Sequence, residues 1–227
     1  MKRLLAGSAT GLTVFGMAGA VKRIKRSIFT GRACLLAAVA ILILAGAAHA
    51  GTIEIFNTGV NGSGVPLIDG TVGDPHYTLI VVPSGSTTDI RVRTSAGGYP
   101  VVGAWIGDDS ISAWIGPNND PSLNGPDIFY TYRTTFDLSG FDPATASLTG
   151  QWAADNELSN ILLNDVPTGK TAGGFNSWSS FTISSGFVAG VNTLDFIVNN
   201  GGGPTGLRVE VTGTASLGLL FLPMIKK

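Results

Sequence analysis

The residues best suited to chemistry are three aromatic side chains that lie close to amides and a carboxylate in an irregular segment. Residues 95–126 of the 227-residue chain are rich in glycine and proline and show no regular hydrophobic period. Such a long loop is uncommon in a compact domain unless it is functional or disordered, and its two tryptophans make disorder the weaker choice. A flat ring can stack on the CH face of a sugar, while amides and carboxylates bond the sugar hydroxyls. The candidate ligand-binding residues are therefore Tyr99, Trp105, Trp114, Asn118, Asn119 and Asp120.

The tryptophans also have an alternative role, because tryptophan is highly buried on average. Trp114 could close one end of the domain, and for Trp105 and Trp114 the core and ligand-binding roles are about equally supported. Trp152 lies on the apolar face of an expected strand and belongs to the core. Trp178 begins another strand and fits either role.

Carboxylates suggest two other kinds of site. Asp108 and Asp109 lie in the irregular segment, and Asp120 and Asp127 follow. Glycoside hydrolysis requires two carboxyl groups about 5–10 Å apart across a sugar. Acidic loop residues are more often simply solvated. Oxygen ligands from loops suit Ca²⁺, and Asp69, Asp74 and Glu210 could supply them, although unliganded surface acids remain the simpler interpretation. We expect no cofactor, with a structural calcium as the one alternative.

Two further motifs indicate structure rather than catalysis. His76 is the only histidine after residue 50, no G-x-S-x-G motif is present, and zinc would need more His or Cys ligands. Gly201, Gly203 and Gly206 fit G-x-G-x-x-G, but a dinucleotide site needs a helix after the glycines. Here Pro204 intervenes and a strand pattern follows, so a hairpin turn is expected. We predict no catalytic residue.

The first fifty residues have the properties of an export signal. They contain seven lysines and arginines and no acidic residue. Residues 22–26 (KRIKR) are basic, and residues 35–48 are apolar but too short to span a bilayer comfortably. Residues 48–50 (AHA) fit a small-x-small cleavage site. We expect a cleaved N-terminal signal helix, with a retained membrane anchor as the alternative.

The composition changes after residue 50. Seven basic residues remain against all 15 acidic residues, which gives residues 51–227 a net charge of −8. Phosphate contacts need clustered Lys and Arg, so this acidic segment argues against nucleic acid as a partner. Cys34, the single cysteine, lies in the leader. The rest of the chain therefore has no disulfide and must be held together by an apolar core.

Residues 51–215 predict antiparallel strands separated by turns. Apolar and polar side chains alternate in residues 128–136, 146–154 and 207–211, whereas residues 155–160 are expected to form a loop. No stripe with a helical period interrupts the pattern. Eight or nine short strands at this spacing predict an all-β, two-sheet sandwich.

Four motifs in this block resemble the sugar-binding jelly-roll domain that accompanies many glycoside hydrolases, and galactose-binding-like domains in general. They are residues 132–138 (YRTTFDL), 152–156 (WAADN), 161–165 (ILLND) and 190–196 (GVNTLDF). Asp165 stands where the family usually has glycine in an Asn-Gly turn. The resemblance implies a jelly-roll β-sandwich that binds carbohydrate without catalysis.

Residues 74–79 (DPHYTL), 114–117 (WIGP) and 186–194 (GFVAGVNTL) are similar to exported bacterial proteins of the exosortase-sorted, PEP-CTERM kind. Those proteins end in a Pro-Glu-Pro motif, an apolar span and basic residues. Residues 216–227 have a short apolar run and two lysines but no Pro-Glu-Pro. The resemblance implies a location outside the cytoplasm: extracellular, on the cell surface or in the periplasm.

Together these observations predict a leader (1–50), one β-sandwich domain (51–215) and a short tail (216–227). The favoured function is an exported, non-catalytic module that binds carbohydrate or a surface polysaccharide and meets membrane only through its leader or tail. The first alternative is a structural protein of the envelope or matrix without a small ligand. The second alternative is a glycoside hydrolase that uses loop carboxylates.

Overall fold

The computed structural model describes residues 50–84, 87–117 and 128–218. Within these ranges the regular structure consists of β-strands and two 3-10 helices, η1 (Ser95–Gly97) and η2 (Pro143–Thr145). None of the helices described is long and apolar enough to cross a membrane. The predicted leader and most of the predicted tail lie outside the described residues.

All strand pairings of the domain are antiparallel. The strands are β1 (Ala50–Ile53), β2 (Thr78–Val81), β3 (Ile90–Arg93), β4 (Trp114–Pro117), β5 (Ile128–Asp137), β6 (Ser147–Leu163), β7 (Val166–Pro167), β8 (Ala172–Ile183), β9 (Val191–Asn200) and β10 (Gly206–Ser216).

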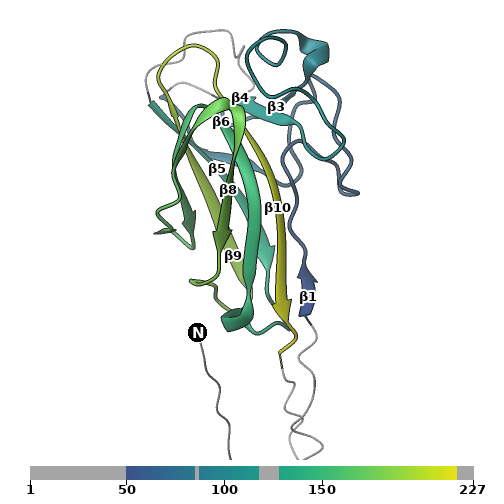
Figure 1. Cartoon of the computed structure of the whole chain (residues 1–227), viewed down its shortest axis with the longest axis vertical. Coiled ribbons are helices and arrows are strands. Elements are labelled where there is room, and N and C mark those ends of the chain that lie inside the picture. The colour runs from purple at the N-terminus through teal and green to yellow at the C-terminus, as the bar shows by residue number, and fades with distance from the viewer. Residues whose placement is uncertain (1–49, 85–86, 118–127, 219–227) are drawn as a thin grey trace, which may run out of the picture. The chain divides into compact units, whose positions relative to one another are not determined.

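The strands form two layers that share β6 (Figure 1). The first half of β6 pairs with β10 and β8, and β10 also pairs with β1 and β4. The second half of β6 pairs with β9, which continues through β5 to β2. One long strand thus passes from one layer to the other.

The apolar core lies between the two layers. Tyr132 and Phe136 on β5 are buried, as the alternating pattern predicted. Phe181 on β8 contacts Trp152 on β6 and Phe196 on β9, with ring centroids 5.3 and 6.3 Å apart, and so joins the two layers. These contacts confirm the all-β, two-sheet jelly-roll sandwich and the core role of Trp152.

Two local predictions were wrong. Residues 155–160 continue β6 instead of forming a loop, because the backbone exchanges β10 for β9 as its partner there and keeps its hydrogen bonds. Register shifts near Ala154 and Leu158 absorb the change of direction. In the segment predicted to be irregular, β4 forms a buried strand that pairs with β3. Its Gly116 and Pro117 concealed the strand pattern.

Glycine and turn residues explain two details of the strands. A Cβ at Gly150 would collide with the carbonyl oxygen of Glu210 and the ring of Phe181, so only glycine fits in the middle of β6. Asn164 and Asp165 both have positive φ (52° and 62°), as a two-residue hairpin turn of the Asn-Gly type requires. The turn predicted at this position therefore forms without its glycine.

Candidate functional site

Residues 95–117, the part of the irregular segment that the structure describes, pack against the outer face of the β8–β6–β10 layer. Trp152 faces the main core, so its neighbour Ala153 faces outward, where it joins a second apolar cluster with Val101, Trp105 and Trp114. The amide of Ile106 also donates to the carbonyl oxygen of Phe175 on β8 (2.8 Å). Residues 95–117 therefore cover this part of the sheet and are called the covering segment below.

The sequence left Trp105 and Trp114 open between a core role and a ligand-binding role, and the structure buries both. Their exposed fractions are 5% and 0%, and their ring centroids lie 4.3 Å apart. The indole N–H of Trp105 donates to Asp155 Oδ2 (2.7 Å), and that of Trp114 donates to the carbonyl oxygen of Ile106 (2.9 Å). Both rings bury their faces because the outer surface of the sheet offers them an apolar layer. Asn118, Asn119 and Asp120 lie outside the described residues.

A buried arginine fastens the covering segment to the sheet. Arg208 on β10 has an exposed fraction of 0% and forms an ion pair with Asp109 (2.7 Å). Its guanidinium also donates to Ser112 Oγ (2.8 Å) and to the carbonyl oxygen of Gly107 (2.7 Å). The half-buried ring of Trp178 lies 5.2 Å from the guanidinium carbon. These bonds compensate the charge of Arg208 and fix residues 107–112 in place.

The two described carboxylates of this segment, Asp108 and Asp109, have different structural partners. Both oxygens of Asp108 accept from the amide of Ser95 (3.0 Å each). Partial burial works to raise the pKa of Asp109, but amide hydrogen bonds from Ile111 and Ser112 and the charge of Arg208 lower it overall. The hydrolase alternative thus has no support from these two residues.

Tyr99 is the exposed aromatic residue of the predicted set. Its exposed fraction is 62%. It borders a pocket of about 110 Å³, referred to below as the Tyr99 pocket. The lining residues are Asp69, Arg93, Thr94, Gly97, Gly98, Tyr99, Pro100 and Val101.

The Tyr99 pocket is built where β3 ends and η1 begins. Thr94 caps η1 by accepting a hydrogen bond from the amide of Ala96, and the amide of Thr94 donates to Asp69 Oδ1 (2.8 Å). A Cβ at Gly97 would lie 2.7 Å from both carboxylate oxygens of Asp69. The carboxylate can lie against the backbone of η1 because residue 97 has no side chain. Gly98, with φ of 81°, then turns the chain toward Tyr99.

The pocket combines three kinds of group. The ring of Tyr99 offers a flat apolar face, Asp69 offers acceptors, and Arg93 brings a guanidinium to the same wall. Such a set can hold a ligand that has both CH faces and hydroxyl groups. Because the pocket is small, it can enclose only part of such a ligand while Tyr99 contacts the rest.

The structure does not bring the three predicted calcium ligands together. No group of three or more His, Cys, Asp or Glu side chains that could hold a metal occurs among the described residues. Asp69 bonds the amide of Thr94, whereas Glu210 accepts from Ser112 Oγ (3.0 Å) and Gln151 Nε2 (2.7 Å). These two carboxylates therefore serve separate parts of the fold.

Asp74, the third predicted calcium ligand, organises a turn instead. Its carboxylate accepts from the amides of Gly59 (2.7 Å), His76 (2.8 Å) and Tyr77 (3.0 Å). Burial raises the pKa of Asp74, although these hydrogen bonds oppose the rise. His76 stacks on Phe56, with centroids 3.7 Å apart and an interplanar angle of 4°, which agrees with the predicted structural role.

The glycine motif does not form the predicted hairpin turn, because β9 and β10 each pair with β6 and not with each other. Gly201 and Gly203 lie in the connection between β9 and β10, and Gly206 begins β10. A Cβ at Gly206 would lie 2.7 Å from the Trp105 ring. Gly206 therefore lets the indole rest directly on the backbone of β10.

Sequence reasoning missed Asp155, which has an exposed fraction of 5%. Burial raises its pKa to about 6, although the hydrogen bond from the indole of Trp105 lowers it. It also missed Arg93 and Thr94. Arg93 ends a predicted strand, and nothing in the local sequence indicates that Asp69 lies beside it.

No family model and no curated protein matches the chain. Among solved structures, the chain is similar to a family 35 carbohydrate-binding module from Paenibacillus barcinonensis, with 19% identity and a TM-score of 0.33 over 63% of this chain and 98% of the module. It is also similar to a family 29 carbohydrate-binding module, with 11% identity and a TM-score of 0.34 over 74% and 89% of the two chains.

A third similar structure is a family 36 carbohydrate-binding module of a multidomain xylanase from the hindgut metagenome of Trinervitermes trinervoides. The identity is 16% and the TM-score is 0.30, over 50% of this chain and 85% of the module. At TM-scores this low, the similarity assigns neither a family nor a ligand to this protein.

Proposed function

We propose that this protein is an exported, non-catalytic β-sandwich module that binds carbohydrate at the Tyr99 pocket. The observation that supports this most directly is the exposed ring of Tyr99 (62%) beside Asp69 and Arg93. A sugar can stack its CH face on an aromatic ring and bond its hydroxyls to charged side chains. The lining of the Tyr99 pocket contains both kinds of group.

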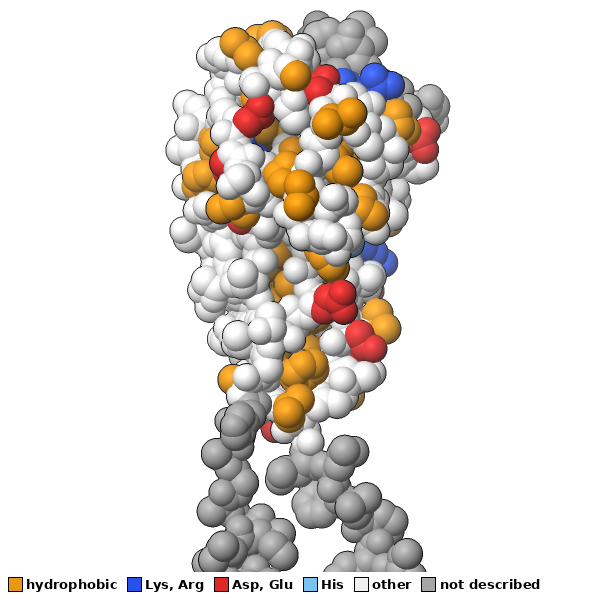
Figure 2. All heavy atoms as spheres, turned by 90° about the vertical axis from the view of Figure 1, so that its right-hand side faces the viewer, with side chains coloured by type: hydrophobic (Ala, Val, Ile, Leu, Met, Phe, Trp, Pro, Cys, Tyr) orange, Lys and Arg blue, Asp and Glu red, His pale blue; other side chains and the backbone are white. Residues whose placement is uncertain are grey.

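Two features support the remaining parts of the proposal. Asp108 and Asp109 are engaged in structural bonds, which removes the most plausible catalytic pair in the described residues. Export is proposed from the basic and apolar leader with its Ala-x-Ala site. On the face seen in Figure 2, basic side chains are sparse and form no continuous patch, which supports a partner other than nucleic acid.

The second candidate is a structural protein of the envelope or matrix. The burial of Trp105 and Trp114 favours it, because an aromatic binding platform would then consist of Tyr99 alone. The two candidates differ in one respect. A structural protein needs no saccharide at the Tyr99 pocket.

A glycan array followed by calorimetric titration tests the proposal. Tyr99→Ala removes the ring and is expected to weaken binding of the retained saccharide about tenfold or more, whereas Tyr99→Phe keeps the ring and most of the affinity. Phe129→Ala is the matched control, because Phe129 is an exposed aromatic (48%) on β5, outside the pocket. Failure of the folded protein to bind any glycan would favour the structural candidate.

A further inference from the structure

A second pocket lies away from the Tyr99 pocket and shares no lining residue with it. Its volume is about 350 Å³, within the range of small-molecule sites (about 300–1,000 Å³). It is lined by the end of β6, by β7, by the loop that follows β7, and by the end of β8 with the first residues beyond it. The lining residues are Leu163, Val166, Pro167, Thr168, Lys170, Thr182, Ile183, Ser184, Ser185 and Gly186. We call it the Lys170 pocket.

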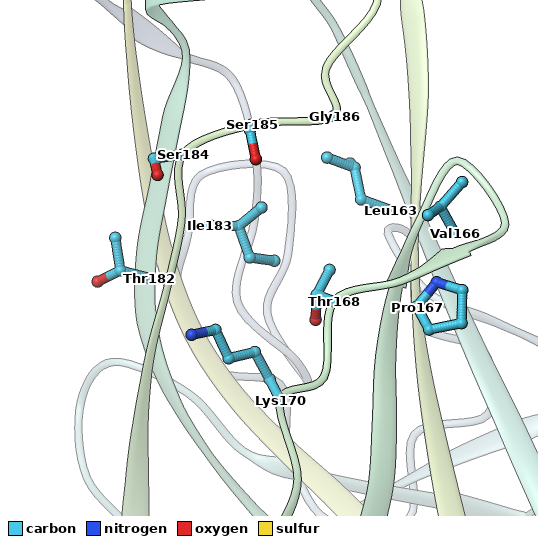
Figure 3. A pocket seen from close by; sticks show the side chains of 10 residues that line it. All are labelled: Leu163, Val166, Pro167, Thr168, Lys170, Thr182, Ile183, Ser184, Ser185 and Gly186. Carbon is cyan, nitrogen blue, oxygen red and sulfur yellow. The ribbon is translucent and has the colours of Figure 1, made fainter.

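Lys170 gives this pocket a positive charge. It is the only lysine among the described residues, and its side chain is half-buried. Arg133 and Arg208 form ion pairs with aspartates, whereas Lys170 forms no ion pair within the part of the chain that the structure describes. Figure 3 shows the ammonium group extending across the pocket toward the segment with Thr182 and Ile183. A cation without a carboxylate, in a segment with a large excess of acids, indicates that an external anion is its partner.

The rest of the lining suits a polyhydroxylated ligand. Thr182, Ser184 and Ser185 provide hydroxyl groups, while Leu163 and Ile183 form an apolar wall. Thr168 donates its hydroxyl to the carbonyl oxygen of Ile161 (2.8 Å) and can still accept a bond. No aromatic ring lines the pocket, so stacking cannot hold the ligand, and charge-assisted hydrogen bonds must do so.

The pocket is also held in shape by bonds behind its wall. Asn164 Nδ2 donates to the carbonyl oxygen of Gly186 (3.1 Å) and to Asn192 Oδ1 (2.8 Å). Asn192 is fully buried and bonds the backbone of Val188 and Gly190. These bonds tie the β6–β7 turn to the loop after β8, so a ligand would meet a pocket that is already formed.

We infer that the Lys170 pocket is a second saccharide site, specific for a sugar that carries a carboxylate or sulfate group. The anion pairs with the ammonium of Lys170, and hydroxyls of Thr182, Ser184 and Ser185 bond the sugar. The inference rests on the proposed function only for the class of ligand. The requirement for an anion comes from this pocket alone.

Amide-resolved NMR titrations of the folded protein with galacturonate, galactose 6-sulfate and neutral galactose test the inference. Resonances of residues 168–170 and 182–186 are expected to shift with at least one anionic sugar and not with galactose. Lys170→Met keeps most of the side-chain length and should weaken that binding about tenfold, since a charged hydrogen bond is lost. Lys170→Arg should retain most of the affinity, and the spectrum of each variant reports its folding.

The outcomes separate this inference from the proposed function. Tyr99→Ala should leave the anion-dependent shifts unchanged. Equal responses to galactose and to the anionic sugars, no response at the Lys170 pocket, or unchanged affinity in Lys170→Met would overturn the inference. A response to the sulfate or to the carboxylate alone would support it and identify the anion. Loss of neutral glycan binding in Tyr99→Ala concerns only the Tyr99 pocket.

Discussion

Tyr99 shows how far a single residue type can be interpreted from sequence. An aromatic residue in a loop rich in glycine, close to polar side chains, predicted an exposed ring, and Tyr99 is exposed. The same reasoning could not decide between a core role and a ligand-binding role for Trp105 and Trp114, and both are buried. Whether an aromatic side chain of this segment is buried depends on contacts with sheet residues far away in sequence, such as Ala153. The local sequence pattern does not indicate these contacts.

Gly97 tests whether the Asp69 carboxylate matters to the Tyr99 pocket. In Gly97→Ala the new Cβ would meet that carboxylate at 2.7 Å, so the flexible side chain must turn away. We expect glycan affinity to fall about tenfold, as for one lost charged hydrogen bond, with little change in the free energy of unfolding. Calorimetric titration and thermal unfolding measure the two effects.

Gly107→Ala is the matched control, because its Cβ would meet nothing within 4 Å and the residue lies in the same segment. Unchanged affinity in Gly97→Ala, with binding intact in the control, would contradict the role given to Asp69.

Asp155 should make the stability of the domain depend on pH. Its pKa is about 6 in the folded protein against 3.8 for the free side chain, so the folded state holds the proton more tightly. Its contribution to stability is complete below pH 3.8 and is lost as pH rises through about 6, by about 2–3 kcal/mol. Other carboxylates titrate in the same range, so the comparison is between the protein and Asp155→Asn.

Urea unfolding from pH 4 to pH 7 measures this difference. The free energy of unfolding of the natural protein should fall relative to that of Asp155→Asn as pH rises across the window. Parallel curves for the two proteins would show that Asp155 titrates normally.

At the scale of elements, two side chains of β10 hold the covering segment: Arg208 makes an ion pair and several hydrogen bonds, and Glu210 accepts one bond from Ser112. Arg208→Met removes the guanidinium that pairs with Asp109 and donates to Ser112 and Gly107, and keeps a long apolar side chain. Breaking a buried ion pair at one partner costs about 3 kcal/mol or more, and we expect a loss of that size. The emission of Trp105 and Trp114 should shift to the red as the segment loosens.

Chemical unfolding followed by fluorescence measures both effects. Thr212→Met introduces the same residue at an exposed position of the same strand and serves as control. A loss in Arg208→Met no larger than in the control would show that apolar packing alone holds the segment.

The sequence predicted elements well where a strand keeps one partner and poorly where partners change. Residues 128–136 alternate because β5 keeps β9 as its partner along its whole length, while β2 pairs with residues 131–133 on the other edge. In β6 the outward positions near Ala153 are covered by the segment, and the strand then moves to β9. Around Ala153 the side chains of β6 are therefore buried on both faces, whereas farther along the strand some are exposed. Apolar and polar residues consequently do not alternate along β6.

At the scale of the whole molecule, the described domain is a two-layer sandwich whose core needs no disulfide. The fold class followed from alternation and turn residues, including the Asn164–Asp165 turn. The sites did not follow, since Asp69, Arg93 and Tyr99 come from different segments, and Lys170 meets Ser184 and Ser185 only across the gap between β7 and β8. A sequence pattern reports periodicity within a segment, whereas a pocket depends on which segments meet.

The central claim is that a saccharide binds on Tyr99. A crystal structure of the protein with the highest-affinity neutral oligosaccharide from the array tests it most directly. We predict a sugar ring in contact with the Tyr99 ring, at about 4 Å between carbon atoms, with its hydroxyls bonded to Asp69 and Arg93. An oligosaccharide bound at another surface, with the Tyr99 pocket empty at saturating ligand, would contradict the account.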